Sequence, residues 1–333
     1  MTIDLGALRR NVRTLLRALG GSELWAVVKA DGYGHGAVDC ARAAVDAGAA
    51  AVCVATVGEA LELRQALPHA RLIVLGPAAD GEVAVARDAV LELVVADEIP
   101  EGVRVHVKLD TGMGRWGVSE LQAPRREVVG LMTHLATADG DLEFARRQVA
   151  RFREATAPYA HLTRHAANSA AALRLPEAHF DAARCGVALY GLSPFGHDAA
   201  ADDLQPVLAW TSEIATSRRL RAGESTGYGR TFTAAADTWI GIVPLGYADG
   251  FRRDLTGTSV VVEGAPCRVV GTVSMDALAV LLDRELPRGT PVTIVGPGAS
   301  LEAHAAVAAT INYELACGIC TDGRRARRRV VSA

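Results

Sequence analysis

The sequence predicts an α/β protein in which a (β/α)₈ barrel of the TIM type is followed by a mostly-β C-terminal domain. Eight short β-rich runs, most of them separated by segments of helical periodicity, lie between residues 24 and 184. After about residue 200, alternating runs with Gly and Pro turns replace the helical pattern. We therefore expect a barrel over 1–205, whose first few residues can pair with the second domain, and a β domain over 206–333. A doubly wound open sheet is the structural alternative for the first part.

The eight runs have the length and the apolar, β-branched composition of buried parallel strands. They are residues 24–29, 50–56, 71–76, 91–96, 103–110, 128–135, 162–167 and 180–184. The intervening segment 36–49 has apolar residues at helical spacing, and so does 141–155. In the second of these helices we expect one face to carry Leu142, Ala145, Val149 and Phe152.

The second domain is predicted from alternating segments that contain few helical patterns. These segments are 210–220, 239–250, 258–282 and 290–298. One late helix is expected around 301–310. A polar, alanine-rich stretch, 197–206, precedes them and marks the change of domain.

The composition favours a small-molecule function. The net charge of the 333 residues is -3 with both signs interspersed, so neither nucleic acid nor a membrane is expected as the main partner. No apolar run approaches the ~20 residues of a membrane-spanning helix, and the first residues lack the apolar core of a signal peptide. A cytoplasmic protein is expected.

Cysteine and arginine clusters give only weak signals. Six cysteines are too sparse for a disulfide framework. Cys317 and Cys320 form a CxxC, but no second pair of ligands accompanies it, so we expect no metal site. The five arginines within Gly323–Arg329 are expected to form a solvated end rather than a nucleic-acid patch.

Chemistry-bearing residues gather where the predicted strands end. In a (β/α)₈ barrel the reactive groups lie in the loops at the C-terminal ends of the strands. Lys29 closes the first run and Lys108 closes the fifth. Near the ends of these and other runs stand Tyr33, Arg115, His134, His165, Asn168, Ser169, Arg184, Gly186 and Val187. Singly, each has an ordinary explanation, such as a solvated lysine or a core histidine. Their coincidence at one rim indicates a functional site.

The rim chemistry points to pyridoxal 5′-phosphate. Lys29, partly desolvated at the end of an apolar strand, is favoured as a neutral amine able to form a Schiff base. Ser169 and the backbone around Gly186 follow strands seven and eight, where such barrels hold phosphate. The glycines after Lys29 do not match GxGxxG, so a dinucleotide is a poor fit.

Nine segments, in order and at matching spacings, resemble the motifs of bacterial alanine racemase. They are AVVKADGYGHG, KLDTGMGRWG, GLMTHLATAD, HAANSAA, ARCGVALYGLSP, STGYGRTF, VPLGYADGF, VSMDAL and TINYELACGI. The match runs from Thr2 to about Ile319. The family implies a (β/α)₈ barrel followed by a β domain and a homodimeric isomerase that makes D-alanine. Whether that product supplies peptidoglycan or a specialised pathway stays open.

The resemblance implies a role for each matching residue. Lys29 would hold the cofactor and act as one catalytic base, and Tyr228 of the partner subunit would be the other. Tyr33, Ser169, Gly186 and Val187 would hold the phosphate, Arg184 the pyridine nitrogen and Arg115 the phenolic oxygen, and Asn168 would also belong to the cofactor site. Tyr247, Met275 and Asp276 would line the substrate entrance from the second subunit, with Arg115 also facing the substrate.

Three further residues would support this site by resemblance. Lys108 matches a lysine that is often carbamylated and braces the arginine. His134 would link Tyr228 to Arg184, and His165 would support Arg184 from behind. Racemisation needs two acid–base groups on opposite faces of a planar intermediate, which is why the family uses two bases.

One departure concerns the substrate pocket. Thr321 stands where the family usually has a tyrosine, and Ser274 where it commonly has cysteine. Losing a phenol would widen the pocket, so serine is an alternative substrate beside or instead of alanine. A non-catalytic cofactor-binding barrel would lack the β domain and Tyr228. A related decarboxylase would need a different acid from the partner subunit.

Overall fold

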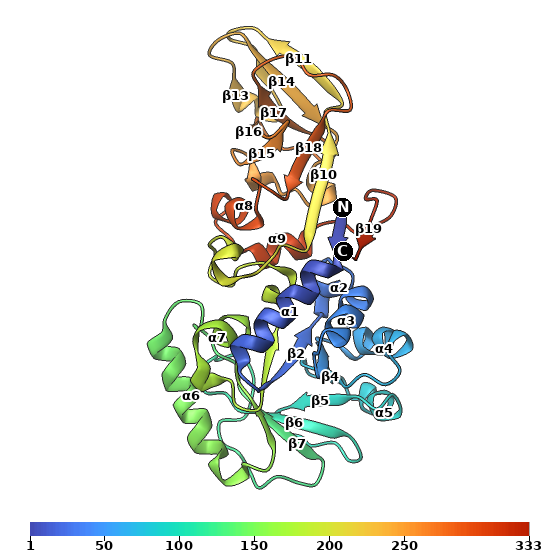
Figure 1. Cartoon of the computed structure of the whole chain (residues 1–333), viewed down its shortest axis with the longest axis vertical. Coiled ribbons are helices and arrows are strands. Elements are labelled where there is room, and N and C mark those ends of the chain that lie inside the picture. Colours follow the sequence, from blue (N-terminus) through green and yellow to red (C-terminus); the bar gives the residue numbers. More distant parts are fainter. Residues whose placement is uncertain (333) are drawn as a thin grey trace. The chain divides into compact units, whose positions relative to one another are not determined.

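The computed structural model describes residues 1–332, which form two compact units. One unit comprises Leu5–Phe195 with Ala200–Gln205. The other comprises Met1–Asp4, Gly196–Ala199 and the chain from Pro206 onward. Figure 1 shows most of the first unit in blue to green and most of the second in yellow to red.

The first unit is a closed barrel of eight parallel strands. These are β2 (Glu23–Val27), β3 (Ala51–Val54), β4 (Leu72–Val74), β5 (Glu92–Val95), β6 (Arg104–Lys108), β7 (Val128–Met132), β8 (Thr163–His165) and β9 (Ala182–Cys185). The first and last of them pair, Leu24 beside Ala183, which closes the ring. The predicted fold class is confirmed, and the open-sheet alternative is excluded.

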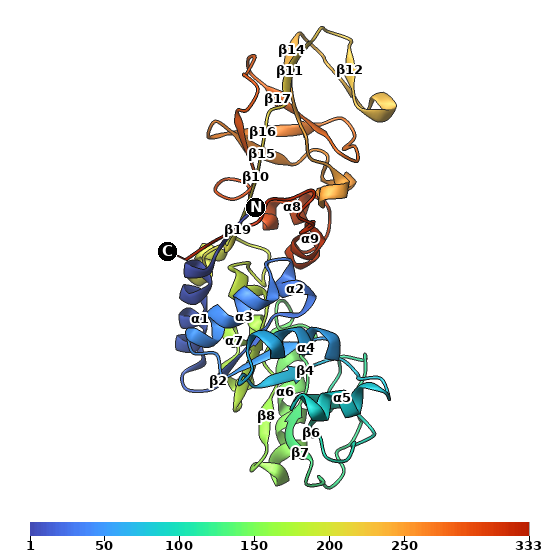
Figure 2. The same ribbon diagram turned by 90° about the vertical axis from the view of Figure 1, so that its right-hand side faces the viewer.

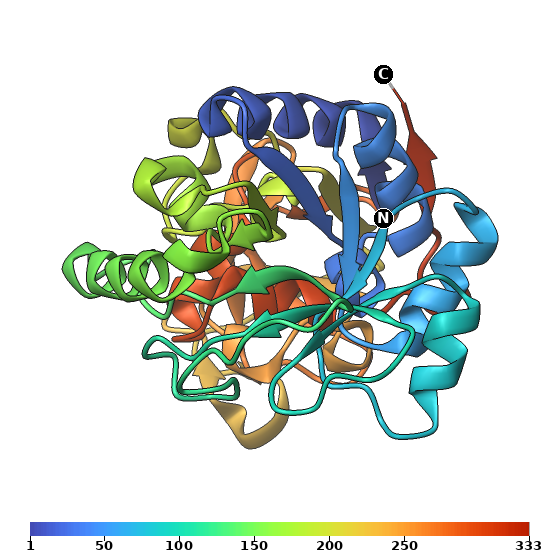
Figure 3. The ribbon, with the colours of Figure 1, turned by 90° about the horizontal axis from the view of Figure 1, so that it is seen from below.

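Helices surround these strands at the periphery of the unit, as Figure 3 shows end-on. They are α1 (Leu5–Leu19), α3 (Ala37–Asp46), α4 (Val57–Ala66), α5 (Glu82–Asp88), α6 (Leu142–Thr156) and α7 (Ser169–Arg174). The short segment α2 (Lys29–Tyr33) has positive φ at Ala30, Asp31 and Gly32 and is a left-handed turn after β2. The apolar face predicted for α6 is buried at Ala145, Val149 and Phe152, and Leu142 is half-buried. A capping box between Thr56 and Glu59 begins α4.

Loops replace helices on both sides of β6. Within the described chain, the connections 96–103 and 109–127 contain no helix. The first is too short, and the second carries three glycines and a proline without helical periodicity. The outer wall of the barrel is therefore covered by loop at this point.

The second unit is built on a nine-stranded, mostly antiparallel sheet. Its order is β11 (Thr216–Leu220), β14 (Thr238–Val243), β17 (Leu278–Leu282), β16 (Ala265–Val270), β15 (Ser259–Val262), β18 (Pro291–Val295), β10 (Leu208–Glu213), β1 (Thr2–Asp4) and β19 (Arg329–Val331). A small hairpin joins β12 (Ser225–Thr226) to β13 (Phe232–Thr233) (Figure 2). Buried Leu220, Ala234 and Ile240 lie in one hydrophobic cluster of this unit.

Two features of the second unit differ from expectation. The late helix is α8 (Leu301–Val307), and a second helix, α9 (Asn312–Gly318), follows it. The arginines of the tail are exposed, as expected, but its backbone is not free, because Arg329 enters β19 and pairs in parallel with β1. No helix within residues 1–332 has both the length and the apolar content needed to cross a bilayer.

Candidate active site

The loop that carries Lys29 has an unusual and tightly fixed backbone. Ala30, Asp31 and Tyr33 all adopt positive φ, between 50° and 55°, a costly conformation for residues with a side chain that is typical of functional sites. Side-chain bonds hold it, since Glu59 accepts from the Ala30 N–H at 2.7 Å and Asp31 accepts from the Ala37 N–H at 2.8 Å. The loop thus places half-buried Lys29 and buried Tyr33 after β2 in one defined geometry.

Three of the predicted phosphate ligands lie against one another. Ser169 Oγ accepts hydrogen bonds from the backbone N–H groups of Gly186 at 3.0 Å and Ala188 at 3.4 Å. A methyl group at Gly186 would lie 2.8 Å from Tyr33 Cζ and would overlap the phenol oxygen. Glycine is therefore required there, and the Ser169 hydroxyl, whose oxygen accepts these N–H groups, keeps its own proton to donate to a phosphate held in this cradle.

Asn168 directly precedes Ser169 in the sequence, and Val187 directly follows Gly186. The side chain of Asn168 caps α7 by accepting from the Ala171 N–H at 3.0 Å. Val187 begins a short 3₁₀ turn directly after Gly186. Both residues follow the strands β8 and β9, so the predicted phosphate residues converge after the last two barrel strands.

Arg184 is buried, yet one of its donors has no protein partner. Its Nη1 donates to His165 Nδ1 at 2.6 Å and to the His165 carbonyl at 3.0 Å. Its Nη2 donates to the Thr133 carbonyl at 2.8 Å and reaches His134 Nδ1 at 3.3 Å. Among residues 1–332, the Nε–H of Arg184 donates to no protein atom, although the residue is only 4% exposed. A buried guanidinium with an open donor suits an acceptor atom such as a pyridine nitrogen.

Four cations surround the site, and they shift the pKa values of their neighbours. Burial first, then Arg184, Arg115, Lys29 and Lys108, lower the pKa of His134 to about 3. Burial and Arg115 lower the pKa of Lys108 to about 8. The predicted residues of the barrel thus form one positive cluster, which favours an anionic ligand.

Lys108 lies in the wall of this cluster rather than at the surface. It is 1% exposed, its ammonium donates to the Trp116 carbonyl, and it stands 4.3 Å from the centre of the Trp116 ring. The sequence contains only two lysines, Lys29 and Lys108, and both belong to the predicted site.

The second unit gathers the other predicted residues on one exposed face. Tyr228 is 72% exposed, Tyr247 43% and Met275 52%. The backbone N–H of Tyr247 donates to the Ser274 carbonyl at 3.1 Å, which joins its segment to that of Met275. Tyr228 and Tyr247 line a hollow of about 360 Å³ together with Arg253, Val273 and Ser274. Exposed aromatic and Met side chains around a hollow are typical of an interaction surface.

Arg325 is a neighbour of this face that the sequence did not reveal. It pairs with Asp276 at 2.6 Å and with Asp249 at 2.9 Å, and Asp249 also accepts from the Gly246 N–H. The tail contains five arginines, and nothing in the sequence indicated that Arg325 among them would bind carboxylates. Thr321 is exposed in the segment between α9 and Arg325.

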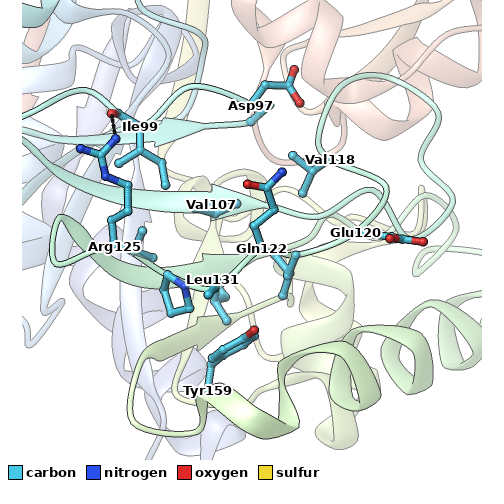
Figure 4. Close-up of a pocket in the computed structure, with 14 residues that line it drawn as sticks. Asp97, Ile99, Val107, Val118, Glu120, Gln122, Arg125, Leu131 and Tyr159 are labelled. Atoms are coloured by element: carbon cyan, nitrogen blue, oxygen red, sulfur yellow. Dashed lines mark hydrogen bonds between the residues drawn. The ribbon is translucent and has the colours of Figure 1, made fainter.

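A separate pocket of about 170 Å³ lies against β6 and β7 (Figure 4). Val107 and Leu131 form its floor, and Tyr159, Glu120 and Arg125 stand at its sides. None of the predicted site residues lines it. It lies under the loops that replace helices around β6 and is distinct from the barrel rim.

Comparison with known proteins places this architecture in one family. The models of the alanine racemase N-terminal and C-terminal domains match residues 3–194 and 207–330. The alanine racemase of Lactiplantibacillus plantarum is 40% identical, with 96% of this chain and 94% of the relative aligned. Alanine racemase 1 of Bacillus subtilis is also 40% identical, over 95% of this chain and 90% of the relative.

Solved structures agree with these matches. Alanine racemase from E. faecalis superimposes with a TM-score of 0.90 at 37% identity, over 99% of this chain and 97% of the other. The Bartonella henselae enzyme, solved with covalently bound pyridoxal phosphate, has a TM-score of 0.88 at 26% identity, over 99% and 98%. The resemblance inferred from the motifs is confirmed: the chain belongs to the alanine racemase family, and it is an isomerase.

Proposed function

We propose that this enzyme interconverts L- and D-alanine with pyridoxal 5′-phosphate, using Lys29 and Tyr228 of the partner subunit as its two bases. The observation that carries the proposal is the buried Arg184, whose Nε–H is open while the rest of its guanidinium is bound. Lys29, the cradle at Gly186 and the cationic cluster belong to the same barrel rim. Lys29 can react with the aldehyde of pyridoxal 5′-phosphate, the cradle at Gly186 can hold its phosphate, and Arg184 can donate to its ring nitrogen.

The barrel residues divide the binding of this cofactor among them. Lys29 supplies the amine that joins it, and Tyr33, Ser169 and Gly186 hold its phosphate. Arg184 donates to the ring nitrogen, and because a guanidinium keeps its proton, that nitrogen is held as an acceptor. When bound, the cofactor withdraws electrons from an attached amino acid and so lowers the barrier to removal of the α-proton.

Two proton carriers are required, and we assign them to two protomers. Lys29 serves one face of the substrate and Tyr228 of the partner subunit serves the other. The exposed face of the second unit, with Tyr228, Tyr247 and Met275, is the surface we expect a second copy to cover. His134 would then link Tyr228 to Arg184. Lys108, once carbamylated, would be an anion that holds Arg115 in place.

A racemisation assay on alanine and serine tests the activity and its specificity together. We expect purified enzyme with added cofactor to be yellow and to convert each alanine enantiomer into the other. Thr321, which stands in place of a larger phenol, favours measurable turnover of L-serine as a second substrate. Comparing kcat/KM for L-alanine and L-serine measures the preference. A colourless protein that racemises neither amino acid would overturn the proposed function, and strict alanine specificity would overturn the role of Thr321.

Substituting Gly186 with alanine is expected to weaken cofactor binding strongly. The added methyl group would overlap the Tyr33 phenol and push it out of the phosphate cradle. Losing one or two charge-assisted hydrogen bonds should raise the Kd for pyridoxal 5′-phosphate by roughly 10- to 100-fold. A titration of cofactor absorbance measures this change.

The matched control for this variant is Gly140→Ala, since an added methyl there meets no atom within 4 Å. It should bind the cofactor as the parent enzyme does. Equal Kd values for the two variants would show that the cradle at Gly186 does not hold the phosphate.

A further inference from the structure

A continuous hydrogen-bonded chain runs inside the barrel from Glu92 to Arg184. Glu92 Oε2 accepts from His106 Nε2 at 2.8 Å, and His106 Nδ1 lies 2.9 Å from His165 Nε2. His165 Nδ1 in turn accepts from Arg184 Nη1 at 2.6 Å. The four side chains come from β5, β6, β8 and β9, and each is at most 4% exposed.

Only one arrangement of protons satisfies every hydrogen bond between Glu92 and Arg184. Arg184 can only donate, so His165 Nδ1 must be an acceptor and its Nε2 carries the proton. That proton is donated to His106 Nδ1, which leaves His106 with its proton on Nε2, facing the Glu92 carboxylate. Burial lowers the pKa values of both histidines, which favours the neutral forms that this arrangement requires. Every link then has one donor and one acceptor.

The fold makes room for this chain and holds its anionic end. Gly130 on β7 stands beside the His106 ring, where a methyl group would lie 2.6 Å from His106 Cε1. Arg71 binds both carboxylate oxygens of Glu92, at 3.1 Å and 2.9 Å, and Arg104 adds a contact at 3.0 Å. Burial alone would raise the pKa of Glu92, but the hydrogen bonds from His106 and Arg71 lower it to about 2.

We propose that Glu92 and His106 are positioning residues that act through His165 to fix the orientation and hydrogen-bond polarity of Arg184. The inference rests on the proposed function, because it assigns the purpose of the chain to presenting the Arg184 Nε–H at the barrel mouth. Arg184, which only donates, fixes the tautomers from one end, and the Glu92 carboxylate, which only accepts, anchors His106 at the other end. His165 then offers Arg184 an acceptor and never a competing donor.

The tautomers can be measured without any variant and without the cofactor. In ¹⁵N-histidine NMR of the cofactor-free enzyme at pH 7, we expect His106 and His165 both neutral and protonated on Nε2. His165 protonated on Nδ1, or charged, would overturn the proposal. Because this spectrum does not depend on turnover, it tests the chain even if the protein should not racemise alanine.

The variant Glu92→Gln tests the functional consequence, with Glu127→Gln as its control. Glu127 is likewise buried and bound by arginines, Arg125 and Arg126, but it has no recorded contact with the histidine chain. A glutamine at 92 is uncharged and can turn either its oxygen or its NH₂ group toward His106 Nε2, so we expect a weaker hydrogen bond and a shifted, broader His106 Nε2 signal, with His165 still protonated on Nε2. We also expect kcat to fall about tenfold, the equivalent of one hydrogen bond, with KM changed less than about twofold.

Both variants are compared per folded, cofactor-loaded enzyme. Glu127→Gln should retain the parent tautomers and kcat. Identical kinetics and spectra for the two variants, or a Glu92→Gln effect confined to thermal stability, would show that the chain is only structural.

Discussion

Lys29→Ala should abolish both racemisation and covalent attachment of the cofactor, the largest effect expected of any single substitution. On the proposed mechanism, the change removes at once the amine that joins pyridoxal 5′-phosphate and one of the two bases. We expect the rate to fall by more than about 10⁴-fold and the yellow colour to be lost on gel filtration. Assay of alanine racemisation, with absorbance of the filtered protein, measures both.

The lysine content of the chain makes the attachment site easy to identify. With only Lys29 and Lys108 present, borohydride reduction of the loaded enzyme can label just two side chains. Peptide mapping should find the label on Lys29, both in the parent enzyme and in Lys108→Arg. Label on Lys108, or on neither, would contradict the assignment of Lys29.

Tyr228→Phe should preserve cofactor binding and colour while reducing racemisation by roughly 10²- to 10⁴-fold, the usual contribution of a general acid–base group. The ring is kept and only the hydroxyl that carries a proton is lost. Exchange of the α-proton into D₂O separates the two faces of the substrate. With Lys29 intact, one alanine enantiomer should still exchange, and the other should not.

Tyr159→Phe is the control for this loss of a phenol, because Tyr159 lines the separate pocket on the barrel wall (Figure 4). It should exchange and racemise both enantiomers normally. If Tyr228→Phe slowed exchange of both enantiomers equally, Tyr228 would not serve a single face.

The barrel could be predicted from the sequence because its strands are short, apolar and buried on both sides. Runs such as 24–29 and 50–56 then stand out from the amphipathic helices around them. The residues at the barrel rim could be predicted from the same strand pattern, because parallel strands bring their carboxyl ends together. Local periodicity therefore located Lys29, Ser169 and Arg184 at one end of the unit.

Features set by contacts distant in sequence could not be predicted in this way. The bonds of Arg325 to Asp249 and Asp276 depend on tertiary folding of the tail, and nothing local distinguishes it from Arg324. The same holds for Glu92, which is a lone acid in an apolar run until the barrel closes beside His106. Helix α9 is as short as α8, but it was missed because its sequence, NYELACG, shows no clear apolar period.

The central claim is that each catalytic site combines Lys29 of one protomer with Tyr228 of the other. Mixed dimers of Lys29→Ala and Tyr228→Phe, isolated by two different affinity tags, test it most directly. Each parent variant should have at most about 1% of the wild-type activity, but a mixed dimer would contain one site with both bases intact and one with neither. We predict about half of the wild-type activity per dimer. Isolated mixed dimers that remain as inactive as the two parents would contradict a site shared between protomers.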